Sequence, residues 1–223
     1  MATLVCFHAH PDDEAIATGG LMTLAKRDDH EVVLVLATRG EQGEPQPGVL
    51  NDGEPLWERR VVETHQAAEI MGLDRVEFLG YEDSGMIGEP TNENPLCFWQ
   101  ADVEEASQRL AKILRDVDAD VLTIYDSHGG YGHPDHIQVH RVGHRAADIA
   151  VANGRKIRVL ESTMNRTRIA QMMEQMGGGD FDPEAPADDG NPFGTLQEEI
   201  TMAVDVSEFV QAKRSSIMCH ASQ

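Results

Sequence analysis

A chain of 223 residues with 40% hydrophobic residues is long enough and apolar enough for one large globular domain. Its formal net charge of −21 repels nucleic acid and anionic membrane surfaces, so neither is expected as a partner. No apolar run approaches the roughly 18 residues that a membrane helix needs, and the N-terminal MATLVCFHAHPDDE lacks the basic start of a signal peptide. The three cysteines are far apart and form no CxxC pair, which favours a reducing compartment. We therefore expect a cytoplasmic protein, with the oligomeric state left open and a homo-oligomer included.

Strands and helices are predicted to alternate along most of the chain. Short apolar runs rich in β-forming residues predict buried strands over residues 3–7, 31–37, 75–79, 120–125 and 157–161. Helical spacing predicts helices over residues 15–26, 56–71, 101–115, 134–151 and 164–176, with Gly72 ending the second. This alternation indicates an α/β fold with a mostly parallel sheet flanked by helices. In such folds, ligands bind at the carboxyl ends of the strands.

The last part of the chain departs from this alternation. Residues 177–194 are dominated by Gly, Asp and Pro, which bury little apolar surface, so we expect a mobile surface loop or lid there. Residues 199–204 are predicted to form a strand at an edge of the sheet, and residues 207–220 a final helix. Because no internal repeat is present, we expect a single domain over residues 1–223.

The first chemically distinctive motif lies at the turn from the first strand to the first helix. Two histidines and three acids fall within seven residues: His8, His10, Asp12, Asp13 and Glu14. Imidazole and carboxylate are the ligand set of catalytic zinc sites. Acids are also favoured at the positive end of a helix dipole, but helix capping leaves the two histidines unexplained. The HxHxD spacing is also found in metallo-β-lactamases, but residue 13 is Asp where that pattern has His, and this chain begins with a parallel β-α-β unit.

A second motif, YGHPDH, follows the strand predicted at residues 120–125. Its His133 and His136 are one helical turn apart, and His140 and His144 continue the stripe. Scattered histidines on a solvated helix are the alternative interpretation, and we assign His140 and His144 to the helix surface or to support of the site. A catalytic zinc needs three protein ligands and an open position, of which the first motif can supply two and the second one. Asp135 is placed to orient a histidine.

HPDDE at residues 10–14, followed by YGHPDH at residues 131–136, resembles the GlcNAc-phosphatidylinositol de-N-acetylase (PIG-L, LmbE-like) family. Three segments between the motifs strengthen the likeness, which is close over residues 3–162: ATRGEQGE (37–44), RVVE (60–63) and LGYEDSGM (79–86). Within the family, the chain is most similar to the actinobacterial mycothiol-pathway branch, which comprises a biosynthetic deacetylase and a conjugate amidase. The resemblance implies a Rossmann-like domain, and a continuation beyond Gln223 that contributes to the substrate pocket.

The resemblance also implies roles for individual residues. It places one Zn²⁺, or Fe²⁺ in some members, on His10, Asp13 and His136. It makes Asp12 the general base, Tyr131 the group that polarises the carbonyl, His133 the oxyanion donor, and Asp135 the residue that keeps His133 protonated and aligned. It assigns substrate binding to Arg60 and Asp83. From the residues alone, Arg60 could instead form a surface salt bridge with Glu63, Asp83 could be a turn former, and Glu14 could bond a ligand or cap the helix.

These observations predict a zinc-dependent hydrolase that cleaves the N-acetyl or N-acyl amide of an amino-sugar substrate, with Asp12 as general base. A non-catalytic metal- or sugar-binding module is the alternative from another class, and Asp12 argues against it because binding needs no base beside the metal. A mycothiol S-conjugate amidase and a zinc phosphoesterase or lactamase are further alternatives. Phosphoesterases usually assemble two metals, whereas we count ligands for one. Mycothiol precursor, mycothiol conjugate, N-acetylchitooligosaccharide and an antibiotic intermediate all remain open as substrates.

Overall fold

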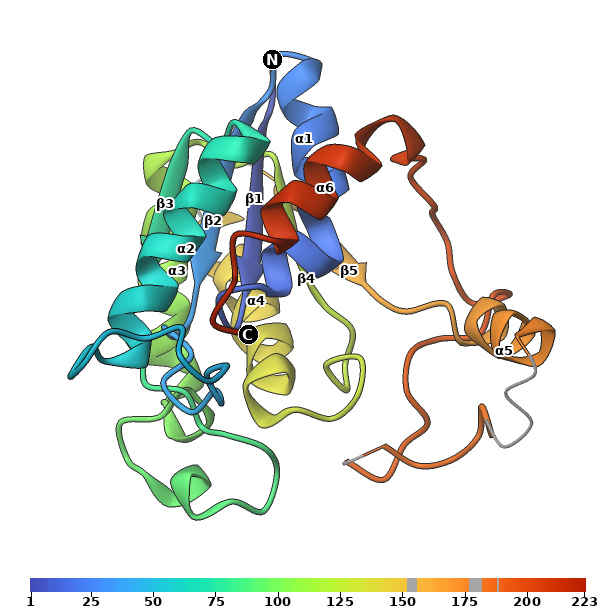
Figure 1. The fold of residues 1–223 in the computed structure, drawn as a ribbon. Coiled ribbons are helices and arrows are strands. Elements are labelled where there is room, and N and C mark those ends of the chain that lie inside the picture. The colour runs from blue at the N-terminus through green and yellow to red at the C-terminus, as the bar shows by residue number, and fades with distance from the viewer. Residues whose placement is uncertain (152–155, 177–181, 188) are drawn as a thin grey trace.

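Five parallel strands form the centre of the computed structural model, which describes residues 1–151, 156–176, 182–187 and 189–223. They are β1 (Thr3–His8), β2 (Glu31–Leu36), β3 (Arg75–Phe78), β4 (Val121–Tyr125) and β5 (Arg158–Ser162). The strand order is β3-β2-β1-β4-β5, and every neighbouring pair is parallel (Figure 1). The sheet therefore extends from the central strand β1 in both directions. Parallel strands that alternate with helices confirm the predicted α/β fold.

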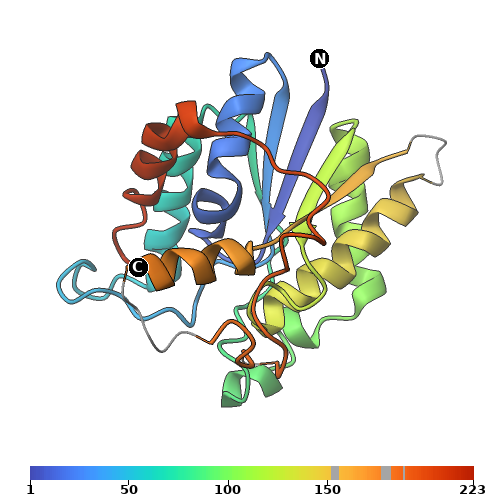
Figure 2. The same cartoon turned by 90° about the vertical axis from the view of Figure 1, so that its right-hand side faces the viewer.

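Helices cover both faces of the sheet. In the part of the chain that the structure describes they are α1 (Gly19–Arg27), α2 (Leu56–Met71), α3 (Val103–Asp116), α4 (Pro134–Val151), α5 (Arg166–Gln175) and α6 (Val210–Ile217). Figure 2 shows α3 and α4 on one side of the sheet and α1, α2 and α6 on the other. Side chains alternate accordingly, since Val5 and Phe7 of β1 pack in the core of the first side while Leu4 and Cys6 pack in the core of the second. Both faces are buried, which explains the uninterrupted apolar runs.

Most element boundaries agree with the sequence patterns. The helices α2 and α4 span the predicted residues, and Gly72 ends α2 with a φ of 73°. The first helix differs, because a π-helical segment over Glu14–Thr18 precedes α1. The Thr18 hydroxyl donates to the Glu14 carbonyl and contacts the buried His8 ring, and such side-chain bonds compete with the regular helical pattern.

The strand predicted at residues 199–204 is wrong. These residues are turn and irregular backbone with no strand partner among the described residues. Met202 and Val204 are 46% and 43% exposed, so the apolar pattern there is not buried against a sheet edge. The final helix is also shorter than predicted, with a 3₁₀ turn over Ser207–Phe209 before α6.

The segment expected to be mobile, residues 177–194, is only partly covered by the structure. Residues 177–181 and 188 lie outside the described residues, so the expected mobility stays a prediction. At its end, the Gly194 N–H donates to the Gly130 carbonyl at 2.7 Å, which joins this segment to the loop after β4. Among the helices of the described residues, none is long and apolar enough to cross a membrane.

Close packing of α4 on β4 gives a first testable prediction. A Cβ added at Gly143 would lie 2.4 Å from Ile124 Cγ2, well inside normal contact distance. We expect Gly143→Ala to destabilise the protein by about 1–3 kcal/mol through overpacking, despite the better helix propensity of alanine. Gly19→Ala is the matched control, because no atom lies closer than 3.4 Å to its added Cβ. Urea unfolding of both variants measures the difference, and equal stability would contradict this account of the packing.

Candidate metal centre and active site

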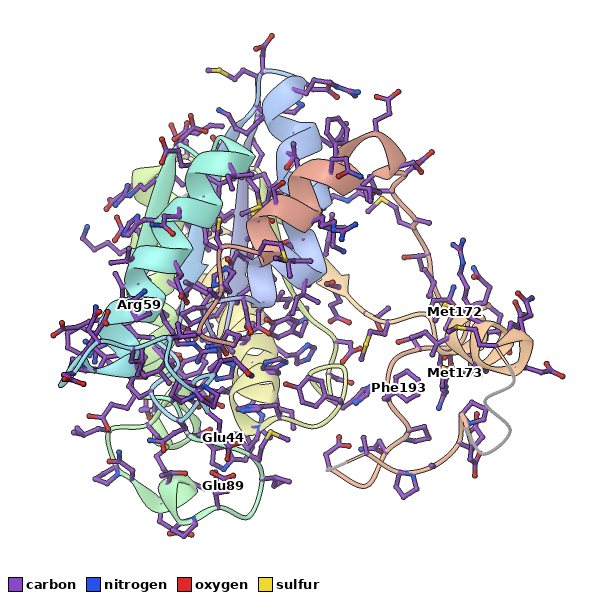
Figure 3. The ribbon with its side chains drawn as sticks, viewed as in Figure 1. Glu44, Arg59, Glu89, Met172, Met173 and Phe193 are labelled. Carbon is purple, nitrogen blue, oxygen red and sulfur yellow. The ribbon has the colours of Figure 1, made fainter. Side chains whose placement is uncertain are left out.

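The candidate site lies where the strand order reverses. β1 ends at His8, and its neighbour β4 ends at Tyr125. From these two carboxyl ends the chain continues to helices on opposite faces of the sheet, α1 after β1 and α4 after β4. Such a switch point opens a crevice in doubly wound sheets. A pocket of about 360 Å³ occupies this edge, and Glu89, labelled in Figure 3, lines it from the loop between β3 and α3. Its other lining residues include His10, Asp12, Asp13, Arg60, Asp83, Tyr131 and His133.

Asp13 lies beside both of the histidines that are assigned to the metal with it. Asp13 Oδ2 lies 3.5 Å from His10 Nδ1 and 3.3 Å from His136 Nε2. Two atoms bound tetrahedrally to one zinc ion at about 2.0–2.1 Å lie about 3.3 Å apart, so this spacing fits a common ion. His10 and His136 are buried, and the Asp13 side chain is 16% exposed.

The tautomer of His136 supplies an independent test of the metal fit. Its Nδ1 lies 3.2 Å from the Gly129 carbonyl, which can only accept, so Nδ1 carries the proton. Nε2 then faces the Asp13 carboxylate, and this buried atom has no hydrogen-bond partner among the described residues. An imidazole nitrogen this close to an acceptor-only carboxylate needs a proton or a metal cation between the two atoms. The residues present therefore fit a divalent metal.

His133 is a weaker candidate for the same ion, although its ligand atom lies within 4.8 Å of those of His10 and His136. The backbone N–H of Asp135 donates to His133 Nδ1 at 3.1 Å, so a neutral ring carries its proton on Nε2. Burial, followed by the positive charges of His10 and His136, lowers the pKa of His133 and keeps the ring neutral. A protonated Nε2 is a hydrogen-bond donor and cannot bind a metal, which suits His133 to an oxyanion rather than to an ion.

Asp135 contacts a different histidine from the one expected. Its Oδ2 lies 3.0 Å from His10 Nε2 and accepts the Ser84 N–H at 2.9 Å, while only its backbone reaches His133. The interpretation that Asp135 keeps His133 protonated is therefore corrected: the carboxylate orients His10. Hydrogen bonding from His10 Nε2 to a carboxylate leaves Nδ1 directed at Asp13, the arrangement that metal-binding histidines commonly show.

Asp12 and Asp13 are neighbours with opposite environments. Burial, then the charge of Asp13, raises the pKa of Asp12 to about 7, although Arg60 and His10 oppose the shift. Burial also disfavours the charged form of Asp13, but the charge of His136 and bonds to His10 and His136 outweigh it, so its pKa lies well below the usual range. Asp12 has a φ of 98°, a backbone conformation that residues other than glycine rarely adopt. Adjacent carboxyls with divergent pKa values suit one ligand and one proton carrier.

Arg60 and Asp83 both line the pocket, but protein contacts already hold them. Arg60 is 4% exposed and donates to the Gly40 carbonyl at 2.7 Å, with its Nη2 3.8 Å from Asp12 Oδ2. It makes no surface salt bridge with Glu63. Asp83 accepts the Gln42 and Gly85 backbone N–H groups and lies 3.4 Å from His10 Nε2. Both residues are positioned at the pocket, while substrate binding by either stays a prediction.

Tyr131 comes from the glycine-rich loop between β4 and α4. Its ring lies edge-on to the rings of His133 and His136, with centroids 6.2 and 5.1 Å away. Burial, then the charge of Asp13, raises the pKa of Tyr131, so its hydroxyl stays a donor. The adjacent Gly130 and Gly132 have φ values of 78° and 95°, which non-glycine residues rarely adopt, and these values let the loop turn Tyr131 into the pocket.

The sequence motifs also include His8, His140 and His144, which do not line the pocket. His8 is fully buried between Tyr125 and Thr18, with a 2.8 Å contact to each hydroxyl, and burial lowers its pKa to about 4. It supports the site indirectly, since the Tyr125 ring stacks on His136 at 4.4 Å. His140 and His144, both on α4, approach Glu161 of β5 at 3.4 and 2.7 Å.

Two residues with close links to the site were not assigned from sequence. His220, after α6, lies 2.7 Å from the buried Glu14 carboxylate, which in turn accepts the Asp12 N–H at 2.9 Å. Asp126, after β4, accepts the Gly130 N–H at 2.7 Å and shapes the loop that carries Tyr131. Glu14 therefore bonds the backbone beside the metal ligands rather than a ligand side chain.

Comparisons with known proteins find sequence matches over nearly the whole chain. The family described as GlcNAc-PI de-N-acetylase, PIG-L, matches residues 5–147. The 1D-myo-inositol 2-acetamido-2-deoxy-alpha-D-glucopyranoside deacetylase of Thermobifida fusca is 39% identical over 237 residues, which cover 99% of this chain and 82% of that protein.

Solved structures share the fold at lower identity. The N,N′-diacetylchitobiose deacetylase of Pyrococcus horikoshii superimposes with a TM-score of 0.65 at 20% identity, covering 99% of this chain and 70% of the other. GalB, the 4-carboxy-2-hydroxymuconate hydratase of Pseudomonas putida KT2440, gives 0.66 at 22% identity, covering 100% and 80%. Because a hydratase and a deacetylase share this fold, these likenesses carry the fold alone.

Proposed function

We propose that this chain, which belongs to the GlcNAc-PI de-N-acetylase (PIG-L) family, is a metal-dependent hydrolase that removes the N-acetyl group from an amino-sugar substrate. A deacetylase acting on amino sugars is the activity named for its relatives of 39–41% identity. The observation that carries the metal-dependent mechanism is the convergence of His10, Asp13 and His136 beside Asp12, a carboxyl that stands outside the ligand set.

The ligand set defines what a bound ion contributes. A divalent metal ion held by three protein side chains supplies an activated water and polarises the carbonyl group of the substrate. His10, Asp13 and His136 would hold this ion, which we propose to be Zn²⁺ or Fe²⁺. A histidine must be neutral to bind a metal ion. Burial lowers the pKa of His10, but the surrounding carboxylates outweigh it and raise that pKa, so His10 carries an extra proton in the absence of metal. Metal binding therefore releases this proton.

Asp12 is the proposed proton carrier. It lines the pocket, and its side chain is 26% exposed, so it can reach both solvent and substrate. In amide hydrolysis it takes a proton from the attacking water and passes it to the departing amine, which cannot leave as an anion. Arg60, 3.8 Å away, keeps the carboxylate in place between these two transfers.

Tyr131 and His133 are the proposed donors to the carbonyl oxygen as it becomes an oxyanion. Both line the pocket, the Tyr131 hydroxyl keeps its proton, and a neutral His133 carries its proton on Nε2. Donors already oriented in a buried site stabilise developing charge without reorganisation, and losing one typically costs about 10²–10³ in rate.

Charge in the pocket indicates which sugar fits. Four carboxyl groups line it, from Asp12, Asp13, Asp83 and Glu89, whereas the Arg60 guanidinium is already bonded to the protein. Together with the net charge of −21, this lining disfavours phosphorylated or carboxylated sugars. We propose an uncharged polyol glycoside such as the myo-inositol acetamido-glucoside named for the relatives.

A substrate panel tests the proposal. The protein loaded with Zn²⁺ or Fe²⁺ is offered the inositol-linked N-acetylglucosamine, N,N′-diacetylchitobiose, N-acetylglucosamine 6-phosphate and an S-conjugated N-acyl thiol sugar, and free amine is measured. We expect the inositol glycoside to react with the highest kcat/KM and the phosphorylated sugar with the lowest. Amine release from the S-conjugated sugar alone would indicate an S-conjugate amidase instead of a deacetylase. Absence of release from every compound by metal-loaded protein would indicate a binding module.

A further inference from the structure

The backbone at Asp12 is held in a conformation that it would not adopt by itself. Its φ of 98° lies beyond the left-handed region that Asp tolerates, and only Asp29 and Asp118 share a positive φ among the described non-glycine residues. Such a conformation persists when the surroundings determine it. Whatever holds the Asp12 backbone therefore also sets the direction of its carboxylate.

Glu14 provides the direct restraint. Its Oε2 accepts the Asp12 N–H at 2.9 Å, and its side chain is fully buried. A buried carboxylate is stable only when hydrogen-bonded, and the second oxygen, Oε1, takes its bond from His220 Nε2 at 2.7 Å. His220 is 4% exposed, and its Nδ1 has no partner among the described residues, so Glu14 is the contact that its ring makes there.

The residues around His220 are directed at the same part of the site. The Ser222 N–H and hydroxyl donate to the two oxygens of the buried Glu63 at 3.1 and 2.6 Å, and Arg60 donates to the side chain of Gln223. Figure 1 shows α6 and the C-terminal residues lying against α1 and α2 at the carboxyl end of β1. This segment thus contacts Glu14 on one side of Asp12 and Arg60 on the other.

We infer that His220 is a positioning residue for Asp12, acting through Glu14 and without touching the substrate. Removing its N–H leaves the Glu14 Oε1 buried without a donor. Glu14 then relaxes, the bond to the Asp12 N–H loosens, and the carboxylate of Asp12 loses its fixed direction. The inference rests on the proposed role of Asp12 as proton carrier.

Kinetics of three variants, each loaded to the same metal content, test this chain of contacts. We expect His220→Ala to lower kcat about 10–100-fold, because small misplacements of a reacting group cost about 10²-fold, with KM changed less than threefold. His220→Gln should recover most of kcat, since its amide nitrogen reaches the position of Nε2. Ser216→Ala, also buried and on α6 with its hydroxyl bonded to the Lys213 carbonyl, should leave kcat unchanged. An unchanged kcat in His220→Ala, or an equal loss in Ser216→Ala, overturns the inference.

Two further measurements separate positioning from loss of fold and from failure of the proposed function. In an Asp12→Asn background, His220→Ala should lower kcat less than twofold further, because its effect acts through Asp12. Hydrogen exchange at the Asp12 amide needs no turnover, and we expect it to be at least tenfold faster in His220→Ala and unchanged in Ser216→Ala. Equal exchange in wild type and His220→Ala overturns the inference, whereas an inactive wild type with altered exchange overturns only the proposed function.

Discussion

Replacing Asp12 by asparagine is expected to lower kcat by about 10²–10⁴ while the protein keeps its metal. Asparagine preserves the size of the side chain and its contact with Arg60, but it cannot accept a proton, and general acid–base catalysis typically contributes this factor. KM should change much less, because the lost interaction acts in the transition state. Metal content measured beside kcat separates this loss from loss of the ion.

Asp29→Asn is the matched control for this variant. Asp29 also has a positive φ, of 57°, but lies in the turn after α1, and asparagine tolerates that conformation. The control should keep full activity. Near-normal turnover of Asp12→Asn would overturn the assignment of Asp12 as the general base. Loss of the metal would instead mean that Asp12 and Asp13 have exchanged roles.

The parts of the fold that sequence predicts are those with local signals. Residues 32–36 are all apolar because β2 is covered on both faces. Pro134 begins α4 because its missing N–H costs nothing there. Residues 199–204 also contain strand-forming residues, but in the part of the chain that the structure describes they have no neighbour to pair with. Strand formation depends on a partner elsewhere in the chain, which a short window of sequence does not contain.

The candidate site also has a part that the sequence predicts and a part that it does not. His10, Asp12 and Asp13 lie within four residues, and His133 and His136 are one helical turn apart, so the spacing in each motif identifies its candidate residues. The contacts between the two motifs depend on how the segment after β1 and the segment after β4 face each other in the folded chain, which their spacing does not determine. Asp135 is two residues from His133 in sequence, yet the start of α4 directs its carboxylate across the crevice to His10. His220 is 206 residues from Glu14, so although its segment is similar to the late helix of bacterial family members, the sequence does not predict that the two side chains meet.

The largest effect is expected from the metal ligands themselves. The wild-type protein should bind about one Zn²⁺ or Fe²⁺ per chain, and each of His10→Ala, Asp13→Ala and His136→Ala should lose the ion and with it detectable turnover. Loss of a supporting contact alone lowers metal affinity about 10–100-fold, so removal of a ligand should exceed that range. Elemental analysis after gel filtration measures the occupancy, and the metal-induced rise in Tm, present in the wild type, should disappear in the variants.

His133→Ala decides between the two ligand sets that the distances allow. If Asp13 completes the set, His133→Ala keeps the ion and loses only oxyanion stabilisation, because its Nε2 carries a proton. If the three histidines form the set, His133→Ala loses the ion and Asp13→Ala retains it. The exposed His144→Ala serves as the control, since its ring contacts Glu161 outside the pocket. The orphaned Nε2 of His136 beside Oδ2 of Asp13 favours the first result, because a carboxylate placed there repels a bare lone pair unless a cation lies between them. Full occupancy in all three ligand variants would exclude both sets and leave the convergence of His10, Asp13 and His136 without a chemical role.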